Sequence, residues 1–347
     1  MKRLKNPLRH AGRTLALAVV MFAVSPAPVF AAPGDAAFLA ARDAARKGDA
    51  AQLARALTAL PATHPLRPWA EYWQLKQQLD ADDASGISGI GAFLAANEGS
   101  YLAEKLRGDW LRWLGKRGDR EAFQREWPRL VEANSELRCY AAQVADTPQM
   151  VRSPWLAGED LPTACELLVD RLVAAGGLTV EDVWQRVRRL LEAKKVGAGR
   201  AAAQYLPADQ GFEDKELETI AVDPVRFLTS LPAGFAHSAA APRGRRETVL
   251  FALQRLARSD PQAAAQRLAG LEAAFPAEER AYAWGQIAWQ AARRHQPEAL
   301  AWYDKAQATS LSEEQLAWQA RAALRAQDWG AVWRAIAAMP PAQAAQP

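Results

Sequence analysis

Apolar residues recur at steps of three and four along almost the whole chain, which is the pattern of amphipathic helices. Residues 35–60 follow this pattern with Ala and Leu, and Lys47-Gly48-Asp49 divides them into two short helices. After His64-Pro65, one helical face carries Trp69, Tyr72, Trp73, Leu75 and Leu79. The alternation of apolar and polar residues that is typical of strands is almost absent. The pattern therefore predicts an all-α protein.

Short breaks separate the predicted helices, and they lie at Asn97-Glu98-Gly99-Ser100, Lys116-Arg117-Gly118-Asp119, Gly176-Gly177, Gly197-Ala198-Gly199 and Arg258-Ser259-Asp260-Pro261. At the last break, Ser259 or Asp260 is expected to cap the next helix, with Pro261 in its first turn. Short links make neighbouring helices antiparallel, and a series of such pairs forms an α-solenoid. The breaks are unevenly spaced, so they favour degenerate helical hairpins over a regular tetratricopeptide array, although residues 296–303 look like one such helix.

Turn-forming residues crowd together between Leu206 and Glu247. This predicts a seam with short helices at 207–246, between an N-terminal helical superhelix (32–206) and a second array of hairpins (247–339), with a tail at 340–347. The basic edge of the seam would consist of Arg243, Arg245 and Arg246. A solvated loop is the ordinary interpretation of this edge, and an anion site is the alternative.

The chain has 13 Trp residues, and six of them fall in its Ala-rich last quarter: Trp284, Trp289, Trp302, Trp318, Trp329 and Trp333. Because Ala lets helix axes approach closely, each Trp is expected to fill a gap between helices. Most of them are therefore interpreted as core residues rather than as platforms on which sugars stack.

The first residues have the three parts of an export signal: a basic stretch from Lys2 to Arg13, an apolar run from Leu15 to Val24, and a small-residue site ending in Ala31 and Ala32. We expect a signal peptide over residues 1–31, cleaved after Ala31 or Ala32. The alternative is an uncleaved anchor, but the apolar run is far shorter than the roughly 20 residues that span a bilayer. The mature protein is then expected in the periplasm, without stable membrane insertion.

The formal net charge of +4 comes from this segment. Cleavage would remove five positive charges and no negative one, so the mature chain would carry −1. Its Lys and Arg residues are interleaved with Asp and Glu, which excludes the basic surface of a nucleic-acid-binding protein.

The two cysteines, Cys139 and Cys165, are 26 positions apart. In an exported protein such a pair favours a disulfide, with two separate buried thiols as the alternative. A metal site is less favoured, since the chain has no Cys-x-x-Cys and no His-Glu-x-x-His. The histidines that follow the signal segment, His64, His237 and His295, are far apart in the sequence. We therefore predict no metal ion and no cofactor.

Several motifs resemble the soluble lytic murein transglycosylases of the Gram-negative periplasm. They are Gly99-Ser100-Tyr101, Leu106-Arg107, Trp110-Leu111, Arg138-Cys139-Tyr140, Trp155-Leu156, Leu161-Pro162 with Cys165, Asp182-Val183-Trp184-Gln185-Arg186, 252–261, Trp318, 321–324, Asp328-Trp329, Val332, Ile336 and Met339. The resemblance extends to about Met339 and rests on the order and spacing of these motifs together.

The resemblance implies a superhelix of paired helices that closes into a U shape or a ring, followed by a separate lysozyme-like domain. That domain cleaves the MurNAc-GlcNAc bond with one Glu as acid and base, and the product ends in 1,6-anhydro-MurNAc. The Glu-Ser and Gly-Leu-Met-Gln motifs of that domain do not occur in this sequence. We therefore assign no catalytic residue, and expect the chain to be inactive alone. The residues that contact glycan are not assigned from sequence.

Three hypotheses follow. The chain is the non-catalytic superhelical region of a lytic transglycosylase, which holds peptidoglycan glycan strands and positions the catalytic domain. Alternatively, it is a free-standing periplasmic scaffold for other cell-wall proteins. A third hypothesis, an enzyme with a site among these helices, is disfavoured: the adjacent acids Asp82-Asp83 and Glu313-Glu314 do not face each other on a helix and are interpreted as a solvated loop and a first helical turn.

Overall fold

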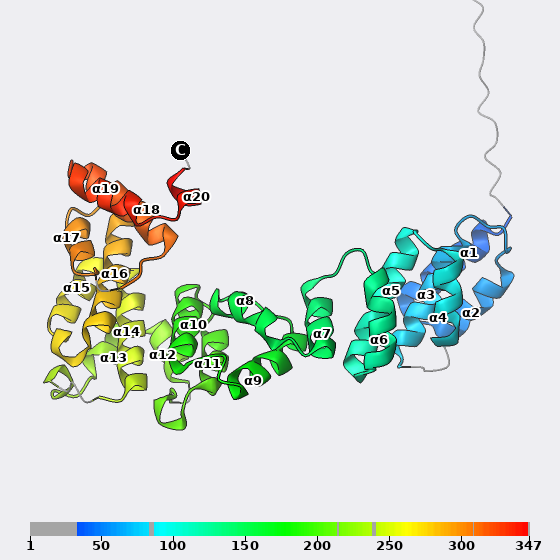
Figure 1. Cartoon of the computed structure of the whole chain (residues 1–347), viewed down its shortest axis with the longest axis horizontal. Helices are drawn as coiled ribbons and strands as arrows, with labels where there is room; N and C mark the ends of the chain where they lie inside the picture. Colours follow the sequence, from blue (N-terminus) through cyan, green and yellow to red (C-terminus); the bar gives the residue numbers. More distant parts are fainter. Residues whose placement is uncertain (1–32, 83–86, 214, 238–240, 308, 346–347) are drawn as a thin grey trace, which may run out of the picture. The chain divides into compact units, whose positions relative to one another are not determined.

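The computed structural model describes residues 33–82, 87–213, 215–237, 241–307 and 309–345. Within these ranges every regular element is a helix, so the predicted all-α class is confirmed (Figure 1). The chain divides into two compact units, of which the first ends at Leu106 and the second begins at Arg107. The signal segment, with Ala31 and Ala32, lies outside the described residues.

The first unit is built from short helices that pack on their neighbours: α1 (Asp35–Lys47), α2 (Ala50–Ala59), α3 (Arg67–Asp80), α4 (Ile87–Ala96) and the beginning of α5 (Tyr101–Arg117). Helix α1 packs on both α2 and α3. The core between these three helices consists only of Ala and Leu: Ala41, Ala44, Leu53, Ala56, Leu57, Leu60 and Ala70. The partly buried rings of Phe38 and Trp73 pack against it.

The link between α1 and α2 shows how the local sequence ends and restarts a helix. Gly48 has φ +71°, a left-handed conformation that L side chains rarely adopt, and its N–H reaches the carbonyls of Ala44 and Ala45. The Asp49 side chain then accepts a hydrogen bond from the Gln52 N–H at 2.9 Å and caps α2. The break predicted at Lys47-Gly48-Asp49 is thus confirmed.

The second unit continues α5 through a longer series: α6 (Arg120–Glu126), α7 (Ser135–Ala145), α8 (Arg152–Leu156), α9 (Glu166–Ala174), α10 (Val180–Glu192), α11 (Val196–Ala202), α12 (Glu216–Val222), α13 (Pro224–Thr229), α14 (Arg243–Ala257), α15 (Pro261–Ala269), α16 (Ala277–Arg293), α17 (Ala299–Asp304), α18 (Glu313–Arg325), α19 (Trp329–Ala337) and α20 (Pro341–Ala344). Consecutive helices pair, as in α10 with α11, α14 with α15, α16 with α17 and α18 with α19.

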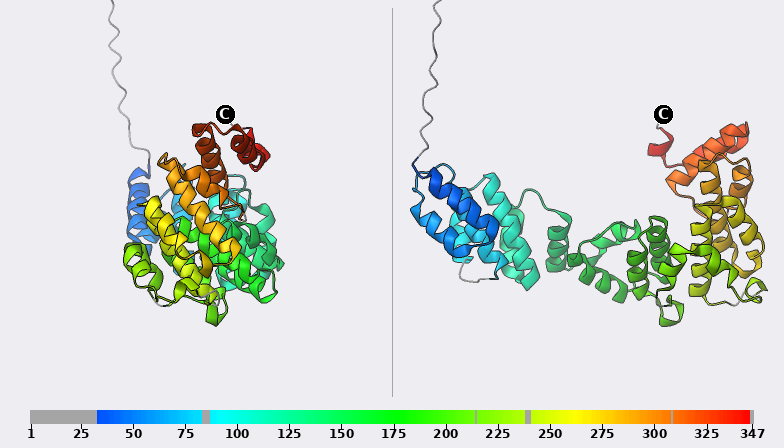
Figure 2. Two further views of the ribbon diagram at one scale, coloured as in Figure 1. Left: turned by 90° about the vertical axis from the view of Figure 1, so that its left-hand side faces the viewer. Right: turned by 180° about the vertical axis from the view of Figure 1, so that it is seen from behind.

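Helices of successive pairs also stack, since α16 packs on both α14 and α18 (Figure 2). This is the arrangement of an α-solenoid. Buried alanines on these pairs, Ala252, Ala257, Ala264, Ala288 and Ala291, let the helices approach closely. Asp260 caps α15 by accepting from the Ala263 N–H at 3.0 Å, whereas the Ser259 hydroxyl donates to the Leu256 carbonyl. Of the two predicted caps, Asp260 is the one used.

The predicted seam at 207–246 lies inside the second unit. It contains the short helices α12 and α13, as expected, but Leu217, Ile220, Leu228 and Phe235 are buried in the same core cluster as residues before and after the seam. The described members of this cluster range along the chain from Cys139 to Ala306. The two compact units divide between Leu106 and Arg107, and the predicted domain bounds stay a prediction.

Candidate functional site: a buried charge network on α10, α14 and α16

An ion pair between Arg188 on α10 and Glu247 on α14 lies at the centre of a polar network. The guanidinium donates to both carboxylate oxygens, at 2.9 and 2.7 Å, and the two side chains are only 11% and 4% exposed. Such a bidentate pair is strongly directional. The Arg188 guanidinium also lies 4.5 Å from the centre of the Tyr282 ring on α16. These contacts place three helices against one charged group.

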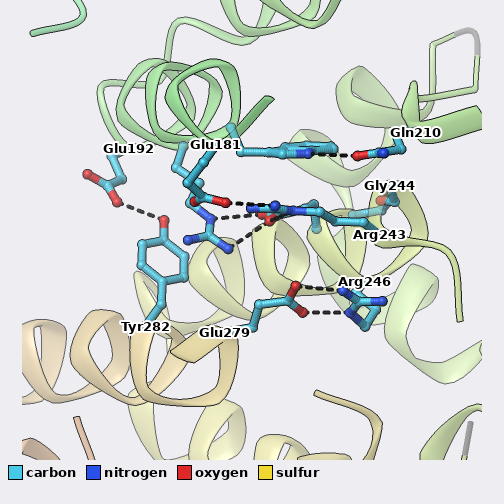
Figure 3. A network of polar contacts seen from close by, with 12 residues as sticks. Glu181, Glu192, Gln210, Arg243, Gly244, Arg246, Glu279 and Tyr282 are labelled. Atoms are coloured by element: carbon cyan, nitrogen blue, oxygen red, sulfur yellow. Dashed lines mark hydrogen bonds and ion pairs between the residues drawn. The ribbon is translucent and has the colours of Figure 1, made fainter. Parts of the chain in front are cut away.

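The start of α14 adds three further ion pairs. Arg243 pairs with Glu181 at 2.7 Å and Arg246 makes two hydrogen bonds to Glu279, at 2.7 and 2.8 Å (Figure 3). Arg245 pairs with a carboxylate of α12, that of Glu216, at 2.6 Å. The prediction of a solvated basic loop is therefore wrong for these three arginines, because they are helical and lie against the acids of neighbouring helices.

Close backbone packing holds the N-terminal end of α14 in place. A Cβ atom at Gly244 would lie 2.5 Å from the Gln210 carbonyl oxygen and 2.7 Å from that of Gly211, so only glycine fits there. The Gln210 side chain accepts a hydrogen bond from the indole N–H of Trp184 at 3.3 Å. The part of the seam around Gln210 and Gly211 therefore packs against α10 and α14 and is not a free loop in solvent.

A second buried acid, Glu192, lies at the C-terminal end of α10. It accepts a hydrogen bond from the Tyr282 hydroxyl (Figure 3) and another from Nε2 of Gln286, both at 2.7 Å and both from α16. Burial raises the pKa of Glu192, although the Tyr282 hydrogen bond and the nearby Arg188 charge oppose this shift. A raised pKa favours the protonated carboxyl, which is the chemical form that a general acid requires.

The space around the network does not admit a substrate. The cavity bordered by Arg188, Glu247 and Tyr282 has a volume of 10 Å³, which is about the space of one water molecule. A sugar ring does not fit in it. We therefore interpret the network as a set of structural contacts that hold α10, α14 and α16 together. The raised pKa of Glu192 is interpreted as a consequence of its burial.

The titration of Glu192 leads to a pH-dependent prediction. The pKa of Glu192 in the folded protein lies above the ordinary value of 4.5. As the pH rises, the unfolded chain therefore releases this proton before the folded protein does. The protonated Glu192 carboxyl stabilises the folded protein, and this stabilisation is lost as the pH passes through the folded pKa. The Glu192→Gln variant keeps an oxygen acceptor for Tyr282 without the charge. We expect the melting temperature of the variant to rise relative to that of the wild type as the pH increases above 4.5, the ordinary pKa of a glutamate.

Thermal denaturation at several pH values measures this difference. Glu278→Gln, at an exposed glutamate on the same helix as Tyr282, is the matched control. A difference between Glu192→Gln and wild type that stays constant across the pH range would contradict the assignment.

The structure contains the predicted disulfide between Cys139 on α7 and Cys165, with Cα atoms 5.1 Å apart. Both residues are buried, at 3% and 0% exposure, and belong to the main core cluster. The bridge connects α7 to the short 3-10 turn Thr163–Cys165 that leads into α9. It therefore links α7 covalently to the segment that leads into α9.

The tryptophans of the last quarter divide into three groups. Trp284 and Trp302 are core residues, as predicted, and their rings lie 6.2 Å apart. Two more, Trp289 and Trp318, pack at the border of the core. For Trp329 and Trp333 the prediction of core packing is wrong, since they are 64% and 70% exposed on one face of α19.

The predicted acid pairs and histidines do not form a reactive site. Glu313 and Glu314 lie in the first turn of α18, and Asp82 lies in a turn next to residues outside the described ranges. His64 hydrogen-bonds Asp35 at 3.1 Å, whereas His295 lies beside Trp318 in the other unit. Within the described ranges, His, Cys, Asp and Glu do not gather in any group of three or more that could bind a metal ion. No helix in the same ranges has both the length and the apolar character needed to span a bilayer.

Solved structures of soluble lytic transglycosylases resemble this chain. One is lytic transglycosylase Slt from Pseudomonas aeruginosa, solved as an inactive mutant, with 26% identity, a TM-score of 0.58, and coverage of 89% of this chain and 50% of that one. The 70-kDa enzyme Slt70 from Escherichia coli matches with 21% identity, a TM-score of 0.51, and coverage of 89% and 50%. A complex of the 70-kDa enzyme with bulgecin A matches with 21% identity, a TM-score of 0.50, and coverage of 90% and 51%.

These similarities confirm the resemblance predicted from sequence, and the described chain has the all-helical, superhelical fold of these proteins. The chain spans about half the length of each of them. No protein-family model and no curated protein matches it. The predicted closure into a U shape or ring stays a prediction.

Proposed function

We propose that this chain is the non-catalytic superhelical region of a periplasmic peptidoglycan lytic transglycosylase. The observation that carries the proposal is the structural similarity to Slt from Pseudomonas aeruginosa over 89% of the chain. In this role the region holds the glycan strand and positions a separate lysozyme-like domain. That domain cleaves the MurNAc-GlcNAc bond and leaves 1,6-anhydro-MurNAc ends.

The contacts of the acids in the buried network support a role in holding the glycan rather than in cleaving it. Glu247, Glu279 and Glu181 are each paired with an arginine, and Glu192 is enclosed by Tyr282 and Gln286. A lytic transglycosylase needs an acid in an open sugar-binding cleft. The proposal includes export of the chain by a cleaved signal over residues 1–31, so that the mature protein meets peptidoglycan in the periplasm.

Sedimentation with purified murein sacculi tests the proposal. We expect the mature chain to co-sediment with sacculi and to release no anhydro-muropeptides, as measured by chromatography of the supernatant. Release of anhydro-muropeptides would contradict the non-catalytic role. Failure to co-sediment would contradict the peptidoglycan-binding role.

The exposed face of α19 favours a second candidate function, that of a periplasmic scaffold for a protein partner. Trp329 and Trp333 are four residues apart on a helix, so their side chains lie on the same face. Exposed tryptophans are enriched at protein interfaces because they bury a large apolar area. This second function is favoured if the chain does not co-sediment with sacculi.

A further inference from the structure

A small cavity lies between the C-terminal end of α16 and the helix α18, within the second unit. It is bordered by the turn His295-Gln296-Pro297 and by Arg321, Ala322 and Arg325 of α18. Its volume is 110 Å³, against 10 Å³ for the cavity beside Arg188. Because the smaller volume corresponds to one water molecule, the larger one admits a small anion together with some of its water.

The two arginines at this cavity have no acidic partner. Arg321 and Arg325 are four residues apart on α18, so they lie on the same face of the helix. No acidic residue is among the described residues that border the cavity, and neither arginine pairs with a described carboxylate. The arginines at the start of α14 differ, since each of them pairs with an acid. Like charges four residues apart repel each other, and a bound anion would offset this repulsion.

Trp318 holds two of the polar groups at the cavity in place. The Arg321 guanidinium lies 5.1 Å from the centre of the Trp318 ring, and the centre of the His295 imidazole lies 6.1 Å from it. The Trp318 ring itself packs against the main core cluster. A ligand would thus meet side chains whose freedom is already restricted, which lowers the entropic cost of binding.

Backbone hydrogen bonds fix the turn that carries His295. This residue has φ +61°, a left-handed conformation with which helices often end, and its N–H donates to the Ala292 carbonyl at 3.0 Å. The Gln296 N–H donates to the Ala291 carbonyl, also at 3.0 Å. These two carbonyls at the end of α16 therefore have donors within the turn, and the groups left to bind a ligand are the side-chain N–H groups.

We infer that this cavity binds a carboxylate of a peptide, and that the peptide is the stem peptide of peptidoglycan. A guanidinium presents its N–H groups as a planar fork that matches the two oxygens of a carboxylate. The imidazole of His295 supplies a further N–H donor. Stem peptides carry carboxylates, whereas the sugar hydroxyls of the glycan are neutral. The inference rests on the proposed function and names the chemical group of peptidoglycan that α18 contacts.

Isothermal titration calorimetry with a soluble disaccharide tetrapeptide from peptidoglycan tests this inference. Arg321→Gln and Arg325→Gln are each expected to weaken binding about tenfold, because each removes charged hydrogen bonds to the carboxylate. Arg321→Lys keeps the charge without the planar fork and is expected to weaken binding less than Arg321→Gln does. The same muropeptide with its carboxylates converted to amides is expected to bind the wild type about tenfold more weakly or worse.

Arg293→Gln is the matched control. Arg293 is also exposed and also lies over a tryptophan, at 5.4 Å from the centre of the Trp289 ring, but it does not border the cavity. We expect this variant to bind the muropeptide like the wild type. An equal loss of affinity in Arg293→Gln and Arg321→Gln would overturn the inference, because net charge alone would then explain the binding.

Inorganic phosphate is the second probe, since a guanidinium also binds phosphate. If phosphate binds and the muropeptide does not, the cavity serves another oxyanion and the inference is wrong. If the wild type co-sediments with sacculi but does not bind the muropeptide, the inference fails while the proposed function survives. If it neither co-sediments nor binds the muropeptide, both fail.

Discussion

Replacing Arg188 by methionine is expected to lower the free energy of unfolding by about 3 to 5 kcal/mol. The variant keeps an apolar side chain of similar length but leaves the Glu247 carboxylate buried, at 4% exposure, without its bidentate partner. The remaining contact of Glu247 with Arg243 is longer, at 3.4 Å, and does not replace two short hydrogen bonds. Urea denaturation followed by circular dichroism measures the change.

The exposed pair of Arg125 and Glu121 on α6 provides the control. Its side chains are 62% and 88% exposed with the same 2.7 Å separation, so Arg125→Met is expected to cost no more than about 1 kcal/mol. The double variant Arg188→Met, Glu247→Met is expected to recover most of the loss, because neither charge of this pair remains to be left without its partner. If Arg188→Met costs no more than Arg125→Met, the network does not hold α10, α14 and α16 together.

Removing the disulfide is expected to have an effect of similar size. Cys139 and Cys165 close a loop of 26 positions, and cross-linking such a loop stabilises the folded state by about 3 to 4 kcal/mol on the chain-entropy model. The double variant Cys139→Ala, Cys165→Ala leaves no unsatisfied polar group at these buried positions. We expect its urea midpoint to fall accordingly, relative to the oxidised wild type.

The reductant provides an internal control for this experiment. Reduction should lower the midpoint of the wild type and leave that of the double variant unchanged. The unfolded, non-reduced mature protein should show no free thiol with a thiol reagent. Titration of two thiols would refute the bridge in the exported protein.

Local features of the structure could be predicted because they depend on residues a few positions apart. The helix break at Gly48-Asp49, the Asp260 cap and the first-turn acids of α18 each follow from one turn of sequence. The all-α class follows from the same short-range periodicity. The motif order was enough to indicate the fold of the soluble lytic transglycosylases, which the structural similarities confirm.

The candidate sites could not be predicted in the same way. Arg188 and Glu247 are 59 positions apart, and Glu192 and Tyr282 are 90 apart. One sequence signal was present: Glu247 lies on the helical face that also carries Leu250 and Phe251, where a charge needs a buried partner. The identity of that partner depends on how α10 packs on α14.

The sequence by itself determined several helix ends, that helices form pairs, and which two cysteines are available for a bridge. The break predicted at Gly197-Ala198-Gly199 is wrong, because α11 (Val196–Ala202) runs through it. The tertiary structure decided which arginines lie against which acids, and that the predicted seam is part of one core. It also decided which tryptophans are exposed, because exposure of a helix face depends on the neighbour that covers it.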